Sequence, residues 1–395
     1  MWSLILLSLV VAMPLEADEL YDAIGQRLGL MQEVAAYKWI NQQPIEAPDR
    51  EALVIKKAKL SGLNHAITTD SSERFFSAQI EAAKEIQQCW FDRWQKSSGP
   101  AESRDLINDV RPRLLELGQT INELLAHQVQ DKTSFMSQTQ VDCLSSEGQQ
   151  KVFEAIKQIQ VYPSRLTQIR DSGIIRIGTT GDYAPFSFSS NGADFKGIDI
   201  ELALLLSEHL DTEVLFVETS WPTLITDLKL GLFDIGMSGI SRIPSREEVA
   251  YFSHAYHIGG KTPIARCDNQ LPLDSLQSID QPGTRVIVNP GGTNERFLDA
   301  HVQQATKILH PDNRTIFDEI VVGNADVMFT DLIEAQLQSQ RAELCMTMHG
   351  ETLTYQEKAY MMPKDPGLLA EVNRWLKQIE NSGQLAKTFA SHLSH

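Results

Sequence analysis

The sequence is poor in cysteine and in positive charge. Only four cysteines occur among 395 residues, and none belongs to a Cys-x-x-Cys motif or to a His/Cys cluster with metal-ligand spacing. We therefore predict no metal and no cofactor. The 35 Lys and Arg are outnumbered by 52 Asp and Glu, which gives a formal net charge of −17. This charge argues against nucleic acid or an anionic membrane surface as a partner, although a local cationic cluster can still bind small anions.

The apolar run near the N-terminus is too short to cross a bilayer. It covers nine residues, 4–12, and is followed by the small residue Ala17 and then by Asp18. This order is typical of a secretory signal with its cleavage site. No basic residue precedes the run, so a buried helix end is the alternative. We expect a signal peptide over residues 1–17, export to the periplasm and no membrane attachment after cleavage.

Glycine and proline are scarce in the first 160 residues, which hold six of the 23 glycines and five of the 16 prolines. Apolar residues there recur three and four apart, as in amphipathic helices. Beyond Pro163, short β-branched runs alternate with Gly-rich turns and helical stretches. The contrast predicts two domains: an all-α helical bundle over residues 18–160 and a two-lobed α/β domain over residues 173–395, joined by a linker over residues 161–172.

The four cysteines divide evenly between these domains. In an exported protein, two cysteines in each domain indicate one disulfide in each. Cys267 and Cys345 lie at the ends of apolar runs and form the better candidate pair. Cys89 and Cys143 form the other candidate pair, with free buried thiols as the alternative.

Cations interrupt the apolar stripes of the helical domain. One helix is predicted over residues 18–42, with Arg27 and Lys38 on its apolar face. A third helix carries Arg113 on its stripe, and Pro112 either kinks that helix or marks the first turn of a shorter one. An unpaired buried charge costs several kcal/mol. Either the long side chains reach solvent, or a bound polyanion supplies the counter-charge.

Polar residues interrupt a further helix in the same way. This helix is predicted to run from a capping box at Asp70–Glu73 to about Lys96, and its stripe places Gln87 among aromatic residues. Pro44 and Pro48 force a short connector before this helix, and Arg50 lies just after that connector. Since no Ser/His/Asp set and no metal site is present, chemistry in this domain would rest on positioning and electrostatics alone.

These residues resemble the exported, all-helical chorismate mutases over roughly residues 18–160. The strings that carry the resemblance are Ala-Ala-Tyr-Lys-Trp at 35–39 and Gln-Pro-Ile-Glu at 43–46. The resemblance implies a pericyclic rearrangement of chorismate to prephenate, without covalent catalysis. It also implies roles for single residues: Arg27, Arg50 and Arg113 meet the carboxylates, Lys38 donates to the breaking ether oxygen, and Gln87 contacts the ether or the ring hydroxyl.

The α/β domain predicts a ligand site where loops leave the strands. The strings GTTGDYAPFSF at 178–188 and FKGIDIELA at 195–203 resemble periplasmic solute-binding proteins of the amino-acid type. Arg246 with the loop 238–241 is predicted to hold a carboxylate, with a surface ion pair as the alternative for the arginine. The turn over residues 289–294 and the helix that is expected to begin at Glu295 form a second anion site. The predicted binding residues are Ser238, Gly239, Ser241, Arg246, Asn289, Gly292 and Thr293.

Further residues are unusual for a plain binding protein. Lys261 follows an apolar strand, and Trp221 lies in a Ser-Trp-Pro loop, where it could cover a ring-shaped ligand. Glu334 lies one helical turn beyond Asp331, so the two carboxylates share a face and can differ in pKa. Taken alone, the position of Glu334 favours a solvated helix residue over a catalyst.

Together, Trp221, Lys261, the string NPGGTNER at 289–296 and Thr-Asp at 330–331 with Glu334 resemble cyclohexadienyl dehydratase. The resemblance implies conversion of prephenate to phenylpyruvate and of arogenate to phenylalanine. Glu334 would protonate the departing ring hydroxyl, Lys261 and Asn294 would orient the reacting groups, and Arg246 would hold the side-chain carboxylate. Asp331 would complete the substrate site.

The sequence thus favours a bifunctional enzyme whose partners are the small dicarboxylates chorismate, prephenate and arogenate. The alternative is a periplasmic solute-binding protein with a helical dimerisation domain; a sensor ectodomain is disfavoured because no transmembrane segment follows the α/β domain. A homo-oligomer is compatible with either reading.

Overall fold

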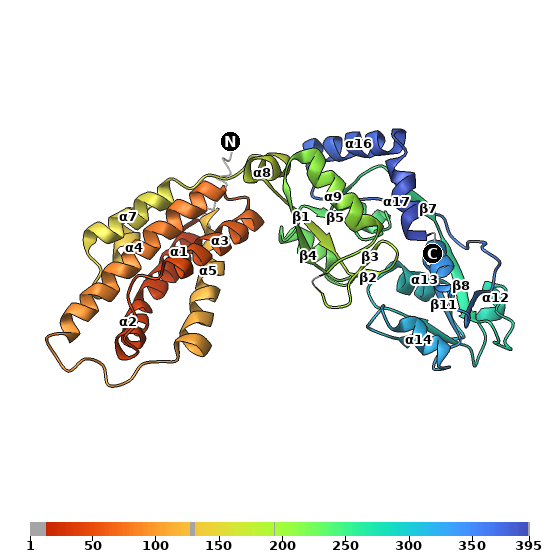
Figure 1. The fold of residues 1–395 in the computed structure, drawn as a ribbon, viewed down its shortest axis with the longest axis horizontal. Coiled ribbons are helices and arrows are strands. Elements are labelled where there is room, and N and C mark those ends of the chain that lie inside the picture. Colours follow the sequence, from red (N-terminus) through yellow and green to blue (C-terminus); the bar gives the residue numbers. More distant parts are fainter. Residues whose placement is uncertain (1–12, 127–130, 193, 394–395) are drawn as a thin grey trace, which may run out of the picture. The chain divides into compact units, whose positions relative to one another are not determined.

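The computed structural model describes residues 13–126, 131–192 and 194–393, with the side chains of residues 13–16 left out. The chain forms two compact units that divide after Pro163, and each is described by itself (Figure 1). The predicted signal peptide lies mostly outside the described residues. No helix in the described part of the chain is long and apolar enough to span a membrane.

The first unit is helical. Its long helices enclose a core that includes Ile24, Phe75, Ile121, Phe135 and Val152, all fully buried. The helix α4 runs through the middle of the unit and packs against α2, α3 and α7 (Figure 1). The helices are α1 (Met13–Gly29), α2 (Met31–Ile40), α3 (Pro48–Gly62), α4 (Thr69–Trp94), α5 (Arg111–Leu125), α6 (Lys132–Gln138) and α7 (Ser146–Lys157), with a π-helical turn at Leu106–Val110 and a 3-10 turn at Leu63–His65.

Helix boundaries differ from the sequence expectation in three places. The helix expected over 18–42 is divided by Leu30 into α1 and α2. Helix α4 is capped by Thr68, whose side chain accepts from the Ser71 amide, rather than by a capping box at Asp70. Pro112 lies in the first turn of α5, where its missing N–H costs no hydrogen bond, and this matches the shorter-helix alternative.

The second unit contains two mixed five-stranded sheets. Their strand orders are β4-β1-β5-β14-β6 and β10-β9-β11-β8-β12, and we call the parts built on them the first and the second lobe. The strands are β1 (Ile174–Thr179), β4 (Glu213–Glu218), β5 (Ile235–Gly236), β6 (Tyr251–Phe252), β8 (Lys261–Arg266), β9 (Arg285–Val288), β10 (Thr306–Leu309), β11 (Val327–Asp331), β12 (Leu344–Met346) and β14 (Met361–Met362).

The chain passes between the lobes through two paired strands. These are β7 (His257–Gly259) and β13 (Gln356–Lys358), which pair antiparallel. Strand β1 is parallel to β4 and β5, and β9 is parallel to β10 and β11, so their carboxyl ends place loops at the cleft. Helices cover the sheets: α9 (Ile198–Leu210) and α16 (Pro366–Asn381) in the first lobe, α13 (Thr293–His301) and α14 (Ile316–Val321) in the second (Figure 1). Helix α15 (Leu332–Gln338) follows β11 directly.

The segment expected as a linker is largely structured. Val161 bridges to Ile67 in the helical unit. Residues Arg165–Ser172 form helix α8, which belongs to the α/β unit because the Arg165 amide donates to Asp365 at 2.6 Å and its guanidinium to Asp234 at 3.0 Å. The sequence pattern concealed α8 because the helix is short and mostly polar.

Both expected disulfides are present in the structure. Cys89 in α4 is bonded to Cys143, and Cys267 after β8 is bonded to Cys345 in β12. Each bond joins residues far apart in the sequence, by 54 and 78 positions, and so restricts the unfolded chain.

Candidate active sites

The helical unit encloses a cavity of about 580 Å³ between α1, α2, α3, α4 and α5. Each helix lines the cavity with a row of residues that are three or four positions apart. From α1 and α2 come Arg27, Met31, Val34 and Lys38; from α3, Arg50, Val54, Lys57 and Ser61; from α4, Phe76, Ala83, Lys84 and Gln87; and from α5, Arg111, Leu114, Gly118 and Asn122. The recurring spacings of three and four explain why cations interrupted the predicted apolar stripes.

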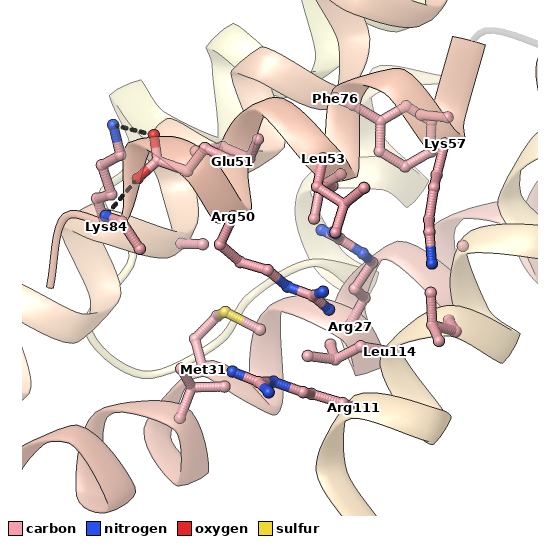
Figure 2. A pocket seen from close by; sticks show the side chains of 18 of the residues that line it. Arg27, Met31, Arg50, Glu51, Leu53, Lys57, Phe76, Lys84, Arg111 and Leu114 are labelled. Atoms are coloured by element: carbon pink, nitrogen blue, oxygen red, sulfur yellow. Dashed lines mark hydrogen bonds and ion pairs between the residues drawn. The ribbon is translucent and has the colours of Figure 1, made fainter. Parts of the chain in front are cut away.

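Positive charge dominates this cavity. Six cations line it, Arg27, Lys38, Arg50, Lys57, Lys84 and Arg111, against two carboxylates, Glu46 and Glu51. One carboxylate is already engaged, since Glu51 pairs with Lys84 at 2.9 Å. Figure 2 shows the guanidinium groups of Arg27, Arg50 and Arg111 pointing into the same space from three helices. The excess of four positive charges fits a small polyanion.

Three of these cations, Arg27, Lys38 and Arg50, are held with lowered pKa values, and burial is the largest cause for each. Burial lowers the pKa of Arg27 to about 10, and its guanidinium donates to Gln79 at 2.5 Å and lies over the Phe76 ring. Burial also lowers the pKa of Lys38, although the nearby Glu51 opposes this. The Lys38 ammonium donates to the Ile45 carbonyl at 2.6 Å, which leaves further hydrogens for a ligand.

Three polar atoms at this cavity lack a hydrogen-bond partner in the structure. They are Nε of Arg27, Oε1 of Gln87 and Oδ1 of Asn122, on side chains at least nine-tenths buried. The Gln87 amide nitrogen donates to the Ala83 carbonyl at 3.0 Å, which leaves the buried side-chain oxygen as an acceptor without a partner. Unpaired buried polar atoms are costly, and a bound hydroxyl or carboxylate would pair them.

Arg113 is not at the cavity, contrary to the sequence expectation. Its side chain is exposed and pairs with Glu116 at 2.7 Å and Gln26 at 2.8 Å. The row that Arg113 begins continues through Leu117 and Ile121, which pack into the core, whereas the row that begins at Arg111 faces the cavity. The π turn at Leu106–Val110 shifts the register by one residue, which a regular helical pattern does not reveal.

The α/β unit has its cleft between the two lobes. Residues from both lobes line it: Tyr183, Trp221, Gly239, Ser241, Arg246, Asn289, Gly292, Thr293, Asn294, Asn313, Asp331 and Lys358. The remaining cavity is about 20 Å³, space for about one water molecule. Interlobe hydrogen bonds close it, including Asn313 to the Asp182 carbonyl at 2.8 Å. A ring-sized ligand therefore requires the lobes to open.

The first lobe supplies a buried guanidinium. Arg246 is 2% exposed, donates to the Ser241 carbonyl at 2.9 Å and lies 6.0 Å from the centre of the Trp221 ring. Burial lowers its pKa to about 10, and Arg296 contributes. No carboxylate is paired with it in the described part of the chain, so an anion in the cleft would be its counter-charge.

Ser238 lies behind this loop, whereas Gly239 lines the cleft. The Ser238 hydroxyl bonds Thr180 and does not line the cleft. The Gly239 amide donates to Asp199 at 2.5 Å, and Tyr256 donates to the same carboxylate at 2.8 Å. The Gly239 amide is thus engaged by Asp199, and the binding role of Gly239, which lines the cleft, stays a prediction.

The second lobe supplies a helix terminus and a lysine. Helix α13 begins at Thr293, so the Gly292–Asn294 turn presents N–H groups to the cleft. The Lys261 ammonium, fully buried, donates to Thr293 at 3.0 Å and to the Asn294 side-chain oxygen. Lys261 lies behind these lining residues and fixes their positions.

Asp331 lies at the centre of an ion network between the lobes. Lys261 donates to its Oδ1 at 2.6 Å, Lys358 donates to its Oδ2 at 2.5 Å, and the Tyr183 hydroxyl also donates to Oδ2. Burial alone would raise the pKa of Asp331, but the two lysines outweigh it and hold that pKa well below the ordinary value. Asp331 is therefore ionised.

Glu334 has the opposite character. It is 2% exposed at the start of α15 and bonds the Thr330 hydroxyl. Burial raises its pKa to about 8, against the Thr330 hydrogen bond and with help from the Asp331 charge. Glu334 is buried behind Thr330 and Asp331 and does not line the closed cleft. The two carboxyl groups lie one helical turn apart but differ in protonation: Asp331 is an ion, and Glu334 is a neutral acid.

Sequence reasoning missed several lining residues, among them Tyr183, Asn313 and Lys358 at the cleft and the cations Lys57, Lys84 and Arg111 at the helical cavity. Lys358 lies on the hinge strand β13 between ordinary charged and apolar neighbours, and nothing in its local pattern distinguishes it. Arg111 has a signal only if the π turn is known. No cluster of His, Cys, Asp or Glu suited to a metal ion occurs among the described residues.

The two lobes, the hinge pair and the interlobe cleft define a solute-binding protein fold. Residues 175–395 match the bacterial extracellular solute-binding proteins of family 3, and the chain belongs to that family. Within it, the chain is 44% identical to cyclohexadienyl dehydratase of Pseudomonas aeruginosa over 238 residues, which cover 60% of this chain and 89% of the relative. Residues 18–88 match chorismate mutase type II.

Other relatives agree on the fold. The L-cystine-binding protein TcyJ of Escherichia coli is 24% identical over 56% of this chain and 82% of its own length. The crystal structure of an ancestral amino acid-binding protein, described as a precursor of cyclohexadienyl dehydratase, is 33% identical with a TM-score of 0.55 and covers 58% of this chain and 100% of its own. The chain is thus an enzyme in which a chorismate mutase domain precedes a lyase domain on a solute-binding fold.

Proposed function

We propose that the two units catalyse consecutive reactions: chorismate to prephenate in the helical unit, then prephenate to phenylpyruvate in the α/β unit. The observation that carries the first step is the cavity with four excess positive charges and unpaired polar atoms. In this step Arg27, Arg50 and Arg111 hold the substrate carboxylates, and Lys38 donates to the ether oxygen as its bond breaks. The Gln87 oxygen accepts from the ring hydroxyl.

The second step needs an acid, and Glu334 is protonated at neutral pH. After the lobes open and close over the ring, Glu334 gives its proton to the ring hydroxyl, and the carbon–oxygen bond breaks to release water. The ring carboxylate leaves as carbon dioxide, and its bonding electrons complete the aromatic ring. Arg246 holds the side-chain carboxylate, and the α13 terminus with Asn294 receives the ring carboxylate.

The family resemblance extends to arogenate, the 2-amino counterpart of prephenate, whose turnover would give phenylalanine. We further propose that the protein acts in the periplasm. The match to an extracellular family and the two disulfides support this location.

The test gives purified protein chorismate alone and follows both loss of chorismate and formation of phenylpyruvate. Untouched chorismate would refute the first step. Prephenate accumulating without phenylpyruvate would refute the second step only. A pure binding protein would leave both chorismate and added prephenate unchanged.

A further inference from the structure

Asp331 is the only carboxylate among the described residues that line the interlobe cleft. An ammonium group entering the cleft would need such an acceptor. Both Asp331 oxygens are already engaged, Oδ1 by Lys261 and Oδ2 by Lys358 together with Tyr183. A 2-ammonium group would therefore have to share Asp331 with two lysines and a tyrosine that already donate to it.

Lys358 is placed to interact with the 2-oxo or 2-ammonium group of a ligand in the cleft. Its ammonium is fixed from both sides, by Asp331 at 2.5 Å and by the Ser241 hydroxyl at 3.0 Å. An ammonium carries three hydrogens and no acceptor, so one donor remains for the cleft. A 2-oxo oxygen can accept that hydrogen bond. A 2-ammonium group cannot accept it and is repelled by the like charge.

The charge balance of the cleft also favours a 2-oxo ligand over a 2-ammonio ligand. Arg246, Lys261 and Lys358 are cationic, and Asp331 alone opposes them, which leaves two positive charges. A dicarboxylate with a 2-oxo group balances this charge completely. Its 2-ammonio counterpart has a net charge of −1 and leaves one positive charge in the cleft uncompensated.

We propose that Lys358 selects 2-oxo dicarboxylates over their 2-ammonio counterparts, so that the α/β unit prefers prephenate to arogenate. This inference rests on the dehydratase function proposed above. Lys358 lies on the hinge strand β13 and donates to Ser241 of the first lobe and to Asp331 of the second, so we place the choice at lobe closure.

The first experiment measures kcat/KM of the full chain with prephenate and with arogenate separately, by formation of phenylpyruvate and of phenylalanine. We expect prephenate to be favoured at least about tenfold, the effect of ~1.4 kcal/mol. Equal efficiencies, or a preference for arogenate, would overturn the proposal while leaving the dehydratase function intact. Turnover of neither compound would overturn the dehydratase function, and the proposal with it.

The second experiment compares Lys358→Met with a matched control, Lys364→Met. Lys364 is exposed and donates to the Glu248 carbonyl at 2.7 Å, away from the cleft. We expect Lys358→Met to lower the prephenate-to-arogenate ratio at least about tenfold, and Lys364→Met to leave it unchanged. An unchanged ratio in Lys358→Met would overturn the proposal. Chorismate loss in the same samples reports whether the helical unit is intact.

A binding measurement covers the case in which Lys358→Met does not fold. Phenylpyruvate retains the 2-oxo group and the side-chain carboxylate of prephenate, and phenylalanine retains the 2-ammonium group and the side-chain carboxylate of arogenate. Titration calorimetry with the unaltered chain gives the affinity for each compound. Tighter binding of phenylpyruvate, by about tenfold or more, is expected. Tighter binding of phenylalanine would overturn the proposal.

Discussion

Arg111 and Arg113 are two residues apart in α5, yet only Arg111 faces the cavity of the helical unit. We predict that Arg111→Ala lowers kcat/KM for chorismate by about 10²–10³, as expected when one preorganised donor to developing charge is removed. The reason is electrostatic, because Arg111 supplies one of four excess positive charges around a dianion. Arg113→Ala removes an exposed pair with Glu116 at 2.7 Å, worth about 0–1 kcal/mol, and should change the rate less than about threefold.

The assay follows loss of chorismate, with prephenate turnover by the same preparations as the control. Both variants should keep the unaltered rate with prephenate, because the substitutions lie in the other unit. Arg111→Lys should fall between the two alanine variants, since it retains the charge but loses the planar guanidinium. A larger loss in Arg113→Ala than in Arg111→Ala would refute the assignment of the cavity face.

The α/β unit allows two further predictions. Glu334 must be protonated to act as the acid, and its pKa is about 8, so prephenate turnover should fall as the pH rises through about 8. Glu334→Gln should abolish prephenate turnover while chorismate loss continues. A pH profile of prephenate turnover that stays flat to about pH 9.5 would contradict the acid role. Gly291, with φ of +80°, lies against Pro222 of the other lobe, where an added Cβ would approach backbone atoms at 2.8 Å. Gly291→Ala should hinder closure of the lobes and lower kcat/KM for prephenate. The control is Gly283→Ala: Gly283 has φ of +96° and open space around it, so this change should affect stability alone. Equal kcat/KM values for prephenate in the two variants would argue against closure at the Gly291–Pro222 contact.

The sequence predicted the helical cavity well where its helices are regular. Arg27 and Lys38 lie on one stripe even though Leu30 divides the predicted helix, because α1 and α2 continue in nearly the same register. Arg113 was misplaced because the π turn adds one residue after Leu106, so the row that faces the cavity continues through Arg111 and Leu114 instead of Arg113. Local pattern cannot show such a turn, since it is determined by packing against neighbouring helices.

The cleft was predictable in its loops but not in its ion network. Arg246 and the α13 turn follow strands, where motifs are short and local. Lys358 is brought to Asp331 by the hinge pairing of β13 with β7, between residues about 100 positions apart. Burial of Glu334 and its raised pKa likewise depend on long-range packing, so the sequence left it open between an acid and a solvated residue.

Asp331 couples substrate choice to acid strength, and Asp331→Asn tests that coupling. The Asp331 charge raises the pKa of Glu334, and it neutralises part of the charge of Lys261 and Lys358. Removing the carboxylate therefore lowers the pKa of Glu334 twice over, by loss of a negative neighbour and by exposing it to two unpaired lysines. Burial, the largest cause of the raised pKa, is unchanged, so the value should stay above the ordinary range.

The alkaline limb of prephenate turnover should consequently move to lower pH in Asp331→Asn. The free energy of unfolding should also fall, by about 3–5 kcal/mol, because buried lysines lose their partner. Tyr183→Phe is the matched control, since it removes one hydrogen bond to Asp331 and leaves the charges in place. A limb that moves to higher pH in Asp331→Asn would show that the Asp331 charge does not set the acidity of Glu334.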